Sequence, residues 1–235
     1  MPIGVLVDCS CVLLGGTLGA IFAKYIPKRV KDNLPKVFGV CGMCLGIKNI
    51  IQVNTMSAVV LAVLLGTAIG ELLYLDRWIN RLGGLLQKPA ERIFTVDKEG
   101  MTQEEFAAQF VTLIVLFCAS GTGIFGALQS GMTGDHSVLL SKAMLDFFTA
   151  MIFATRMGLP VAAVSIPQCI VMLILFYGSA LIMPFTTETI LADFSACGGA
   201  LMFATGLKMA GLLDLSLASL LPAMVLIFPL SALMG

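Results

Sequence analysis

Long apolar runs dominate the chain, and a membrane-crossing helix needs about 20 apolar residues. Six runs reach that length: 3–25, 56–75, 107–127, 138–157, 159–183 and 215–234. Two shorter runs, 37–53 and 194–211, suffice where the bilayer thins locally. None shows the strict alternation of a strand, so the pattern predicts about eight transmembrane helices.

The composition excludes most soluble classes. Of the 235 residues, 58% are hydrophobic and 12% are charged, about half the charge of a soluble domain. The 14 basic and 14 acidic residues balance, so no basic field attracts nucleic acid. We predict an all-α integral membrane protein, a single transmembrane domain over 1–235, with the lipid bilayer as a partner.

The basic residues predict the orientation. Lys24, Lys28 and Arg29 follow the first run and none precedes it, so it is not a cleavable signal peptide and the N-terminus lies outside. With eight spans, 12 of the 14 Lys and Arg residues border the inner loops, and Lys48 and Lys142 are the exceptions. The C-terminus is also expected outside.

A shift of 160 residues aligns the two ends of the chain. It places Gly46-Ile47-Lys48 over Gly206-Leu207-Lys208 and spans 1–3 over spans 6–8. The offset of five spans is odd, so this predicts an inverted 3+3 repeat, an architecture of many transporters. The alternative is a chance match between glycine-rich apolar helices. The predicted parts are repeat 1 (1–75), a cytoplasmic segment (76–106), a central helical pair (107–157) and repeat 2 (159–235).

Glycine pairs four residues apart mark close helix packing. They are Gly15 and Gly19, Gly42 and Gly46, and Gly66 and Gly70, one pair in each of the first three spans. They indicate either packing within one chain or the interface of a homo-oligomer.

Lys142 and Asp146 share one face of the fifth predicted span. Asp146 lies about 13 Å into a hydrocarbon core roughly 30 Å thick. Charged residues at such depth are costly, and they mark substrate or ion sites. A purely structural ion pair is the alternative.

Two neighbouring segments add candidates. Asp135 and His136 precede the fifth span, where they either cap its helix or line a pathway. Ser120 and Thr122 lie among glycines, where a helix break would free carbonyls and hydroxyls as ligands. Close packing of small residues is the alternative there.

Three further polar residues complete the set of candidates. Gln168 follows Pro167, which is expected to interrupt the sixth span. Lys48 and Lys208 lie nearer helix ends and either extend to the interface or contribute to binding.

No enzyme motif emerges. The single histidine cannot form a His-Glu-x-x-His site, and Gly-x-Ser-x-Gly, phosphate-loop and dinucleotide motifs are missing from the sequence. The seven cysteines fall within the apolar runs, and Cys41-x-x-Cys44 has no second pair. We therefore expect no enzyme activity, no metal and no cofactor.

The chain resembles the DUF554 family of bacterial membrane proteins. The resemblance rests on Leu14–Gly19, Gly46–Lys48, Leu65–Glu71 and most specifically Gly131–Asp146, and it runs nearly end to end. Lys208 departs from the Asn or other polar residue expected there. The resemblance implies an inner-membrane location, and the label of transport protein that the family sometimes carries is itself an inference.

These observations predict a transporter or channel for a small solute or ion. Its site would lie between the central pair and spans 2 and 7. The rival is a scaffold or sensor that transports nothing and acts through helix–helix or partner contacts. A water-accessible polar cavity reaching Asp146 would favour transport, and a solidly packed centre would favour the scaffold.

Overall fold

The computed structural model describes residues 1–79, 81, 106, 110, 113–114 and 116–235. Every regular element in these ranges is helical, which confirms the predicted all-α class. In chain order they are α1 (Ile3–Phe22), α2 (Lys28–Ile50), α3 (Met56–Leu72), α6 (Gly121–Thr133), α7 (Ser137–Met157), α8 (Pro160–Ala163), α9 (Ser165–Ile182), η1 (Met183–Phe185), α10 (Glu188–Met209), η2 (Leu217–Leu220) and α11 (Ala223–Met234).

Several helices have the length and apolarity of membrane spans. Five stretches of the described residues qualify: Ile3–Phe22, Ser137–Met157, Pro160–Phe185, Glu188–Met209 and Leu217–Met234. The 17-residue α3 is apolar but shorter. The predicted membrane helices are thus confirmed, whereas the count of eight spans stays a prediction.

Two helices begin before their apolar runs. α2 starts at Lys28, directly after Pro27 in an extended conformation, and it contains four basic residues that precede position 37: Lys28, Arg29, Lys31 and Lys36. α10 starts at Glu188, where the hydroxyl of Thr187 accepts a hydrogen bond from the backbone N–H of Ile190. A side-chain cap at Thr187 therefore marks the start of α10, whereas α2 starts directly after a proline; neither signal is visible in an apolar run.

The predicted fourth span, 107–127, is not one helix. Residues 119–120 are non-helical, and α6 runs from Gly121 to Thr133, past the predicted end. Gly134 terminates α6 with a φ of 75°, which favours glycine. Residues 107–109, 111–112 and 115 of this span lie outside the described residues, as does most of the predicted cytoplasmic segment 76–106.

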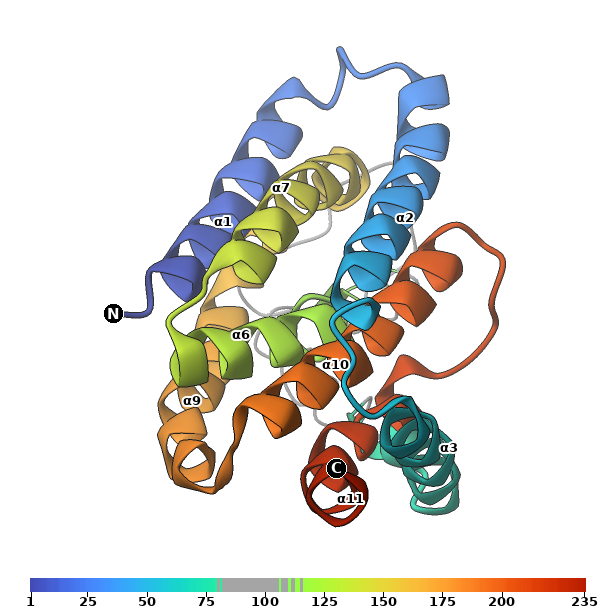
Figure 1. Cartoon of the computed structure of the whole chain (residues 1–235). Helices are drawn as coiled ribbons and strands as arrows, with labels where there is room; N and C mark the ends of the chain where they lie inside the picture. The colour runs from blue at the N-terminus through green and yellow to red at the C-terminus, as the bar shows by residue number, and fades with distance from the viewer. Residues whose placement is uncertain (80, 82–105, 107–109, 111–112, 115) are drawn as a thin grey trace.

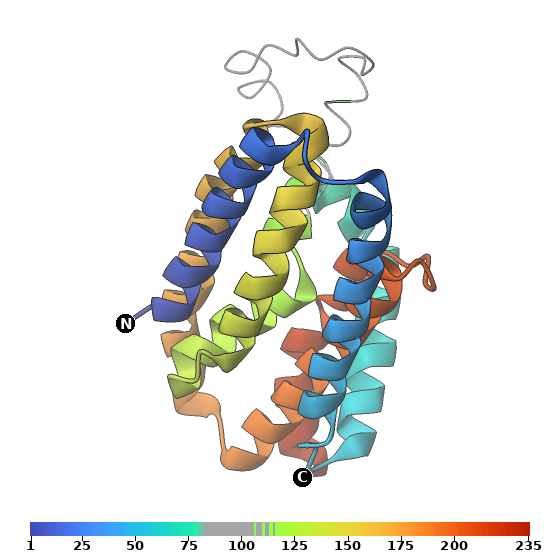
Figure 2. The same ribbon diagram turned by 90° about the horizontal axis from the view of Figure 1, so that it is seen from above.

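The helices pack in pairs. α1 packs mainly against α7, α2 against α10, α6 against α9 and α3 against α11; Figure 1 shows α1 beside α7 and α2 beside α10. In Figure 2 the C-terminus lies at the end of the bundle opposite the α1–α2 connection, and the N-terminus lies at the end of α1 that is farther from this connection.

Glycines bring α2 and α10 into direct backbone contact. A Cβ on Gly39 would lie 2.5 Å from the carbonyl oxygen of Gly206, and a Cβ on Gly206 would lie 2.5 Å from that of Gly39. Gly46 and Gly199 form a second reciprocal pair at 2.7 Å. The earlier glycine of α2 contacts the later glycine of α10, and the later one contacts the earlier one, so the two helices cross antiparallel. Each helix presents a pair of glycines to the other.

The other predicted packing glycines also contact helices of this chain. Gly15 and Gly19 lie against the α7 backbone at Phe147 and Met151, while Gly66 and Gly70 lie against α11 and η2 at Ala223 and Ser219. Gly42 has a looser contact, because its Cβ position is 3.4 Å from Gly206 Cα.

Candidate functional site

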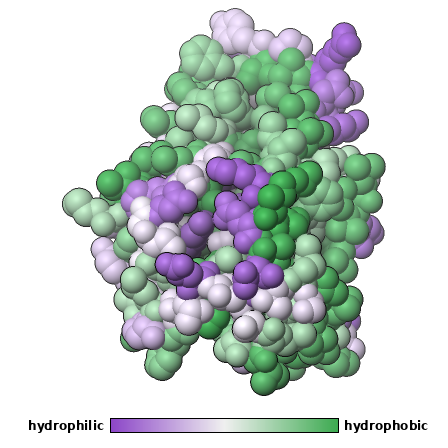
Figure 3. Space-filling model, viewed as in Figure 1, coloured by the Kyte–Doolittle hydropathy of each residue, from purple (hydrophilic) through white to green (hydrophobic). Residues whose placement is uncertain are grey.

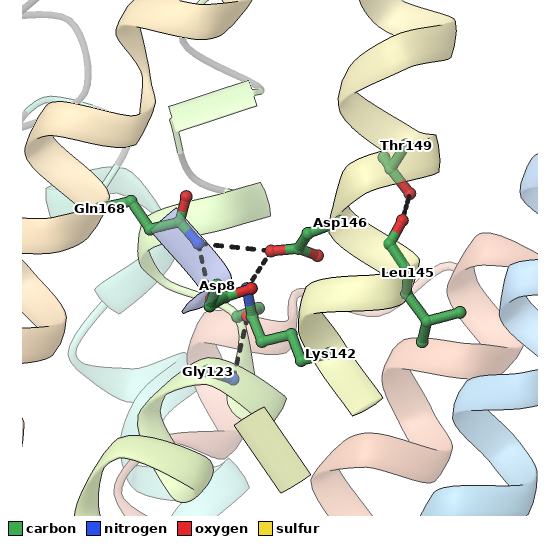
Figure 4. Close-up of polar contacts among 8 residues, drawn as sticks. Asp8, Gly123, Lys142, Leu145, Asp146, Thr149 and Gln168 are labelled. Carbon is green, nitrogen blue, oxygen red and sulfur yellow. Dashed lines mark hydrogen bonds and ion pairs between the residues drawn. The ribbon is translucent and has the colours of Figure 1, made fainter. Parts of the chain in front are cut away.

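Four polar side chains from three helices meet inside the bundle. Asp8 comes from α1, Lys142 and Asp146 come from successive turns of α7, and Gln168 comes from α9. Figure 4 shows them pointing toward one another. We refer to these four residues as the buried cluster.

Both carboxylates share the same two donors. The Lys142 ammonium donates to Asp8 Oδ2 at 3.0 Å and to Asp146 Oδ2. The Gln168 amide nitrogen donates to Asp8 Oδ2 at 2.8 Å and to Asp146 Oδ2 at 3.3 Å. Lys142 and Asp146 thus form the ion pair that their spacing predicts, with Asp8 and Gln168 as additional members.

The buried cluster carries an excess negative charge. With both acids ionised, two carboxylates face one ammonium, which leaves a net charge of −1. Asp8 and Gln168 are fully buried, and Asp8 Oδ1 and Gln168 Oε1 have no hydrogen-bond partner in the described chain. An uncompensated charge out of water costs several kcal/mol, so this arrangement is not explained by stability alone.

A cavity of about 40 Å³ reaches the cluster beside Asp146. It lies between α2, α7, α10 and the start of α6, and its polar lining residues are Ser120, Thr122, Lys142, Asp146, Thr149 and Thr205. Figure 3 shows hydrophilic residues around a hollow near the middle of this face. The Asp146 side chain is 14% exposed, so it is the acid that the cavity reaches.

A second hollow of about 340 Å³ adjoins the first. The two share the lining residues Leu116, Ser120, Thr205 and Met209. The second hollow continues to Asp76 and to Lys208 at the end of α10. The second hollow therefore lies between the wall of the first and the end of the bundle where α3 and α10 terminate.

The start of α6 forms one wall of the cavity. The Ser120 hydroxyl caps the helix by accepting a hydrogen bond from the Gly123 N–H at 3.1 Å. A Cβ on Gly123 would lie 3.0 Å from Lys142 Cε, so this glycine lets the lysine pass close to α6. Thr122 lines the cavity from the same turn.

The helix interruption expected beside Pro167 falls slightly earlier. α8 ends at Ala163, and α9 begins at Ser165 with Pro167 in its first turn, where a missing N–H is tolerated. Gln168 therefore projects from the first turn of α9 into the buried cluster.

Asp135 and His136 lie outside the cavity lining. The Asp135 carboxylate accepts hydrogen bonds from the Ser137 N–H and hydroxyl, each at 2.9 Å, at the start of α7. His136 Nδ1 pairs with the Ser130 hydroxyl at 2.5 Å. Both therefore organise the turn between α6 and α7.

The two remaining lysine candidates are also separate from the buried cluster. Lys48 is exposed on α2. Lys208 donates to the carbonyl of Leu215 at 2.8 Å and lines the second hollow. Among the described residues, no three His, Cys, Asp or Glu side chains gather as metal ligands, and the seven cysteines are free thiols.

Comparisons with known proteins identify the family. The family model "Protein of unknown function (DUF554)" matches residues 3–232. The chain belongs to the DUF554 family.

Two DUF554 relatives cover almost the whole chain. "Uncharacterized protein YqgA" of Escherichia coli (strain K12) is 44% identical over 232 residues, covering 99% of this chain and 97% of the relative. "Uncharacterized membrane protein YdfK" of Bacillus subtilis (strain 168) is 25% identical over 234 residues, covering 95% and 93%. No solved structure gives a significant match.

Sequence reasoning missed two buried acids of this DUF554 chain. Asp8 is an isolated acid in the first apolar run, and it pairs with Gln168, which is separated from it by the same 160 residues as the predicted repeat. Asp193 on α10 accepts hydrogen bonds from the Asn54 and Thr55 N–H groups and from the Ser231 hydroxyl. A search for acids within apolar runs finds Asp8, whereas Asp193 directly precedes the run 194–211.

Proposed function

We propose that this DUF554 protein transports a small solute or ion across the bacterial inner membrane, along the cavity beside Asp146. The observation that supports this proposal is a charged cluster inside apolar helices, reached by a cavity whose mainly apolar wall carries six polar residues. Buried ionisable groups in membrane helices are expensive and are typical of solute and ion pathways.

The proposed architecture is the inverted 3+3 repeat of eight spans. Its support is a helix pattern that recurs at the 160-residue shift: α1 starts at Ile3 and α9 at Ser165, whereas α2 starts at Lys28 and α10 at Glu188. The shift also relates Gly39 to Gly199 and Gly46 to Gly206. If a two-fold axis relates α2 to α10, a contact between Gly39 and Gly206 must be matched by one between Gly199 and Gly46. Both contacts are present.

The proposed orientation places both termini outside. It is supported by the basic residues around the α1–α2 connection, which in Figure 2 lies opposite the C-terminus and at the other end of α1 from the N-terminus. In this orientation the second hollow, with Asp76 and Lys208, opens toward the cytoplasm.

The scaffold or sensor hypothesis gains no specific support. The paired glycines contact helices of the same chain, so a homo-oligomer interface would have to use other surfaces. The cytoplasmic segment that such a sensor would use lies mostly outside the described residues.

A ligand screen followed by uptake tests the transport proposal. Purified protein is screened by thermal unfolding against inorganic ions, amino acids and organic acids, and each compound that raises the unfolding temperature is supplied in labelled form to proteoliposomes. We expect saturable uptake of at least one compound above empty liposomes. Stabilisation without uptake by correctly folded protein, or neither effect, would reject transport.

A further inference from the structure

We propose that the buried cluster binds one exchangeable proton, shared between Asp8 and Asp146 and reached from the cavity through Asp146. The inference deepens the proposed function and rests on it for its use in transport. The protonation itself is a property of the protein at equilibrium, so it is tested without any flux measurement.

The first argument is the charge of the cluster. Lys142 is 3% exposed, and it contacts both carboxylates through their Oδ2 atoms. Its single positive charge balances one of them. One proton on either acid brings the cluster to neutrality, which removes the cost of an unpaired buried charge.

The second argument is the pair of unpartnered oxygens. Asp8 Oδ1 and Gln168 Oε1 are both enclosed and both lack a donor in the described chain. The members of the cluster that can donate, Lys142 and Gln168, already donate to the two Oδ2 atoms. A carboxylic acid adds one donor to a site that has too many acceptors.

Within the part of the chain that the structure describes, the surroundings of the cluster offer no other balancing charge. The titratable neighbours are thiols: Cys9 and Cys11 on α1, Cys118 before α6 and Cys169 on α9. Neutral thiols leave the net charge unchanged. Of the other two lysine candidates, Lys48 is exposed on α2, and Lys208 donates to the carbonyl of Leu215.

A proton suits the cluster better than an alkali cation. An alkali cation needs several oxygens arranged around it, whereas both Oδ2 atoms already bind the Lys142 ammonium at close range. A metal ion there would sit against a positive charge. A proton needs one oxygen only.

The exchange step is a simple proton transfer. The O–H bond of the carboxylic acid breaks, its electron pair stays on the carboxylate, and the proton passes to water in the cavity. The Lys142 ammonium and the Gln168 amide stabilise the carboxylate that remains. Asp146 is the point of exchange because Asp8 is fully enclosed.

Infrared spectroscopy of the purified protein tests this assignment. The carbonyl-stretch band of a protonated carboxylic acid is recorded at neutral pH, where ordinary aspartates are ionised. We expect the band in the wild type and its loss in both Asp146→Asn and Asp8→Asn, because Lys142 then balances the one remaining acid. Asp146→Glu keeps a carboxyl group and should retain the band.

Asp193→Asn is the matched control for burial. Asp193 is fully buried, but three donors satisfy its carboxylate, so the band should persist when it is replaced. Each variant is accepted only if its elution from a size-exclusion column and its thermal unfolding show folded protein. If Asp8→Asn fails to fold, the test rests on Asp146→Asn.

Three results overturn the proposal: no band in the wild type, a band that persists in Asp146→Asn, or loss of the band in Asp193→Asn alone. If the band is missing and sodium chloride stabilises the wild type more than choline chloride does, the cluster binds sodium instead. If the band is present but no compound is taken up, the proton site is retained and transport is rejected. If a compound is taken up but the band is missing, transport is retained and the proton site is rejected.

Discussion

Lys142 holds two carboxylates together inside the bundle. Replacing it with Met leaves Asp8 and Asp146 adjacent without a counter-charge. Removing one partner of a buried ion pair costs about 3–5 kcal/mol, so we predict a large fall in the unfolding temperature of Lys142→Met. Differential scanning fluorimetry in detergent measures it, and an unchanged unfolding temperature would show that the cluster is not a compact charged unit.

Asp146→Asn should behave differently from Lys142→Met. It leaves Asp8 and Lys142 as a balanced pair, with an amide in place of the surplus acid. We predict an unfolding temperature equal to or above that of the wild type. A fall as large as that of Lys142→Met would mean that Asp146 stabilises the protein chiefly as an ion-pair partner.

At the residue scale, local spacing was informative and distant pairing was not. The i, i+4 relation of Lys142 and Asp146 could be read directly, because helix geometry fixes it. Asp8 is 134 residues from Lys142, and no local sequence pattern predicts a contact between residues so far apart. Asp135 and His136 looked equally promising in sequence, but the turn between α6 and α7 binds their side chains.

The crossing of α2 and α10 depends on glycine. A Cβ at position 46 would lie 2.7 Å from the Gly199 oxygen and from the Phe203 nitrogen. Backbone cannot yield as a flexible side chain does, so Gly46→Ala should destabilise the protein by about 1–3 kcal/mol. The unfolding temperature of the purified variant measures this effect.

Gly178→Ala is the control for that substitution. Nothing lies within 4 Å of its Cβ position in α9, and alanine favours a helix over glycine by about 0.5–1 kcal/mol. It should be neutral or stabilising. Equal losses in Gly46→Ala and Gly178→Ala would contradict the close crossing.

Asp193 ties three elements together. Its carboxylate accepts from the α2–α3 connection at Asn54 (2.9 Å) and Thr55 (2.6 Å), and from Ser231 of α11 (2.6 Å). Asp193→Ala leaves these donors unpaired, and we predict a loss of at least about 2 kcal/mol in unfolding free energy. Asp193→Asn retains one acceptor oxygen and should lose less; similar losses would show that the hydrogen bonds contribute little.

At the element scale, apolar runs predicted where helices lie but not where they end. α2 extends into a basic segment because Pro27 and helix-compatible residues permit it, and α6 starts where Ser120 provides a cap. The starts of α2 and α6 both depend on how the first backbone N–H groups of a helix are hydrogen-bonded, and hydropathy does not report this. The glycine spacing indicated close packing, but it did not identify the partner helices.

At the scale of the whole molecule, topology is the first test. We predict that alkaline phosphatase, which needs an oxidising compartment for its disulfides, is active when fused after Gly235. Fused after Leu212, beyond the end of α10, it should be inactive. The opposite pattern in intact cells would reverse the orientation, and activity at both sites would reject α11 as a span.

Sequence predicted the properties of the whole molecule best where they depend on sums over many residues. Apolar content and loop charge are summed over many residues, so they indicate a membrane protein and an orientation. The cavity and its connection to the second hollow depend on how α2, α7 and α10 meet, and that meeting is set by side-chain packing across the chain.

The most direct test of the central claim compares uptake by two carboxylate variants. A compound that stabilises the wild type and is taken up by its proteoliposomes is measured with Asp146→Asn and with Asp32→Asn. Asp32 forms an exposed ion pair with Arg156 away from the cavity, which contributes little stability. We predict that Asp146→Asn folds and loses uptake while Asp32→Asn retains it; equal uptake by both would contradict a pathway through the cavity at Asp146.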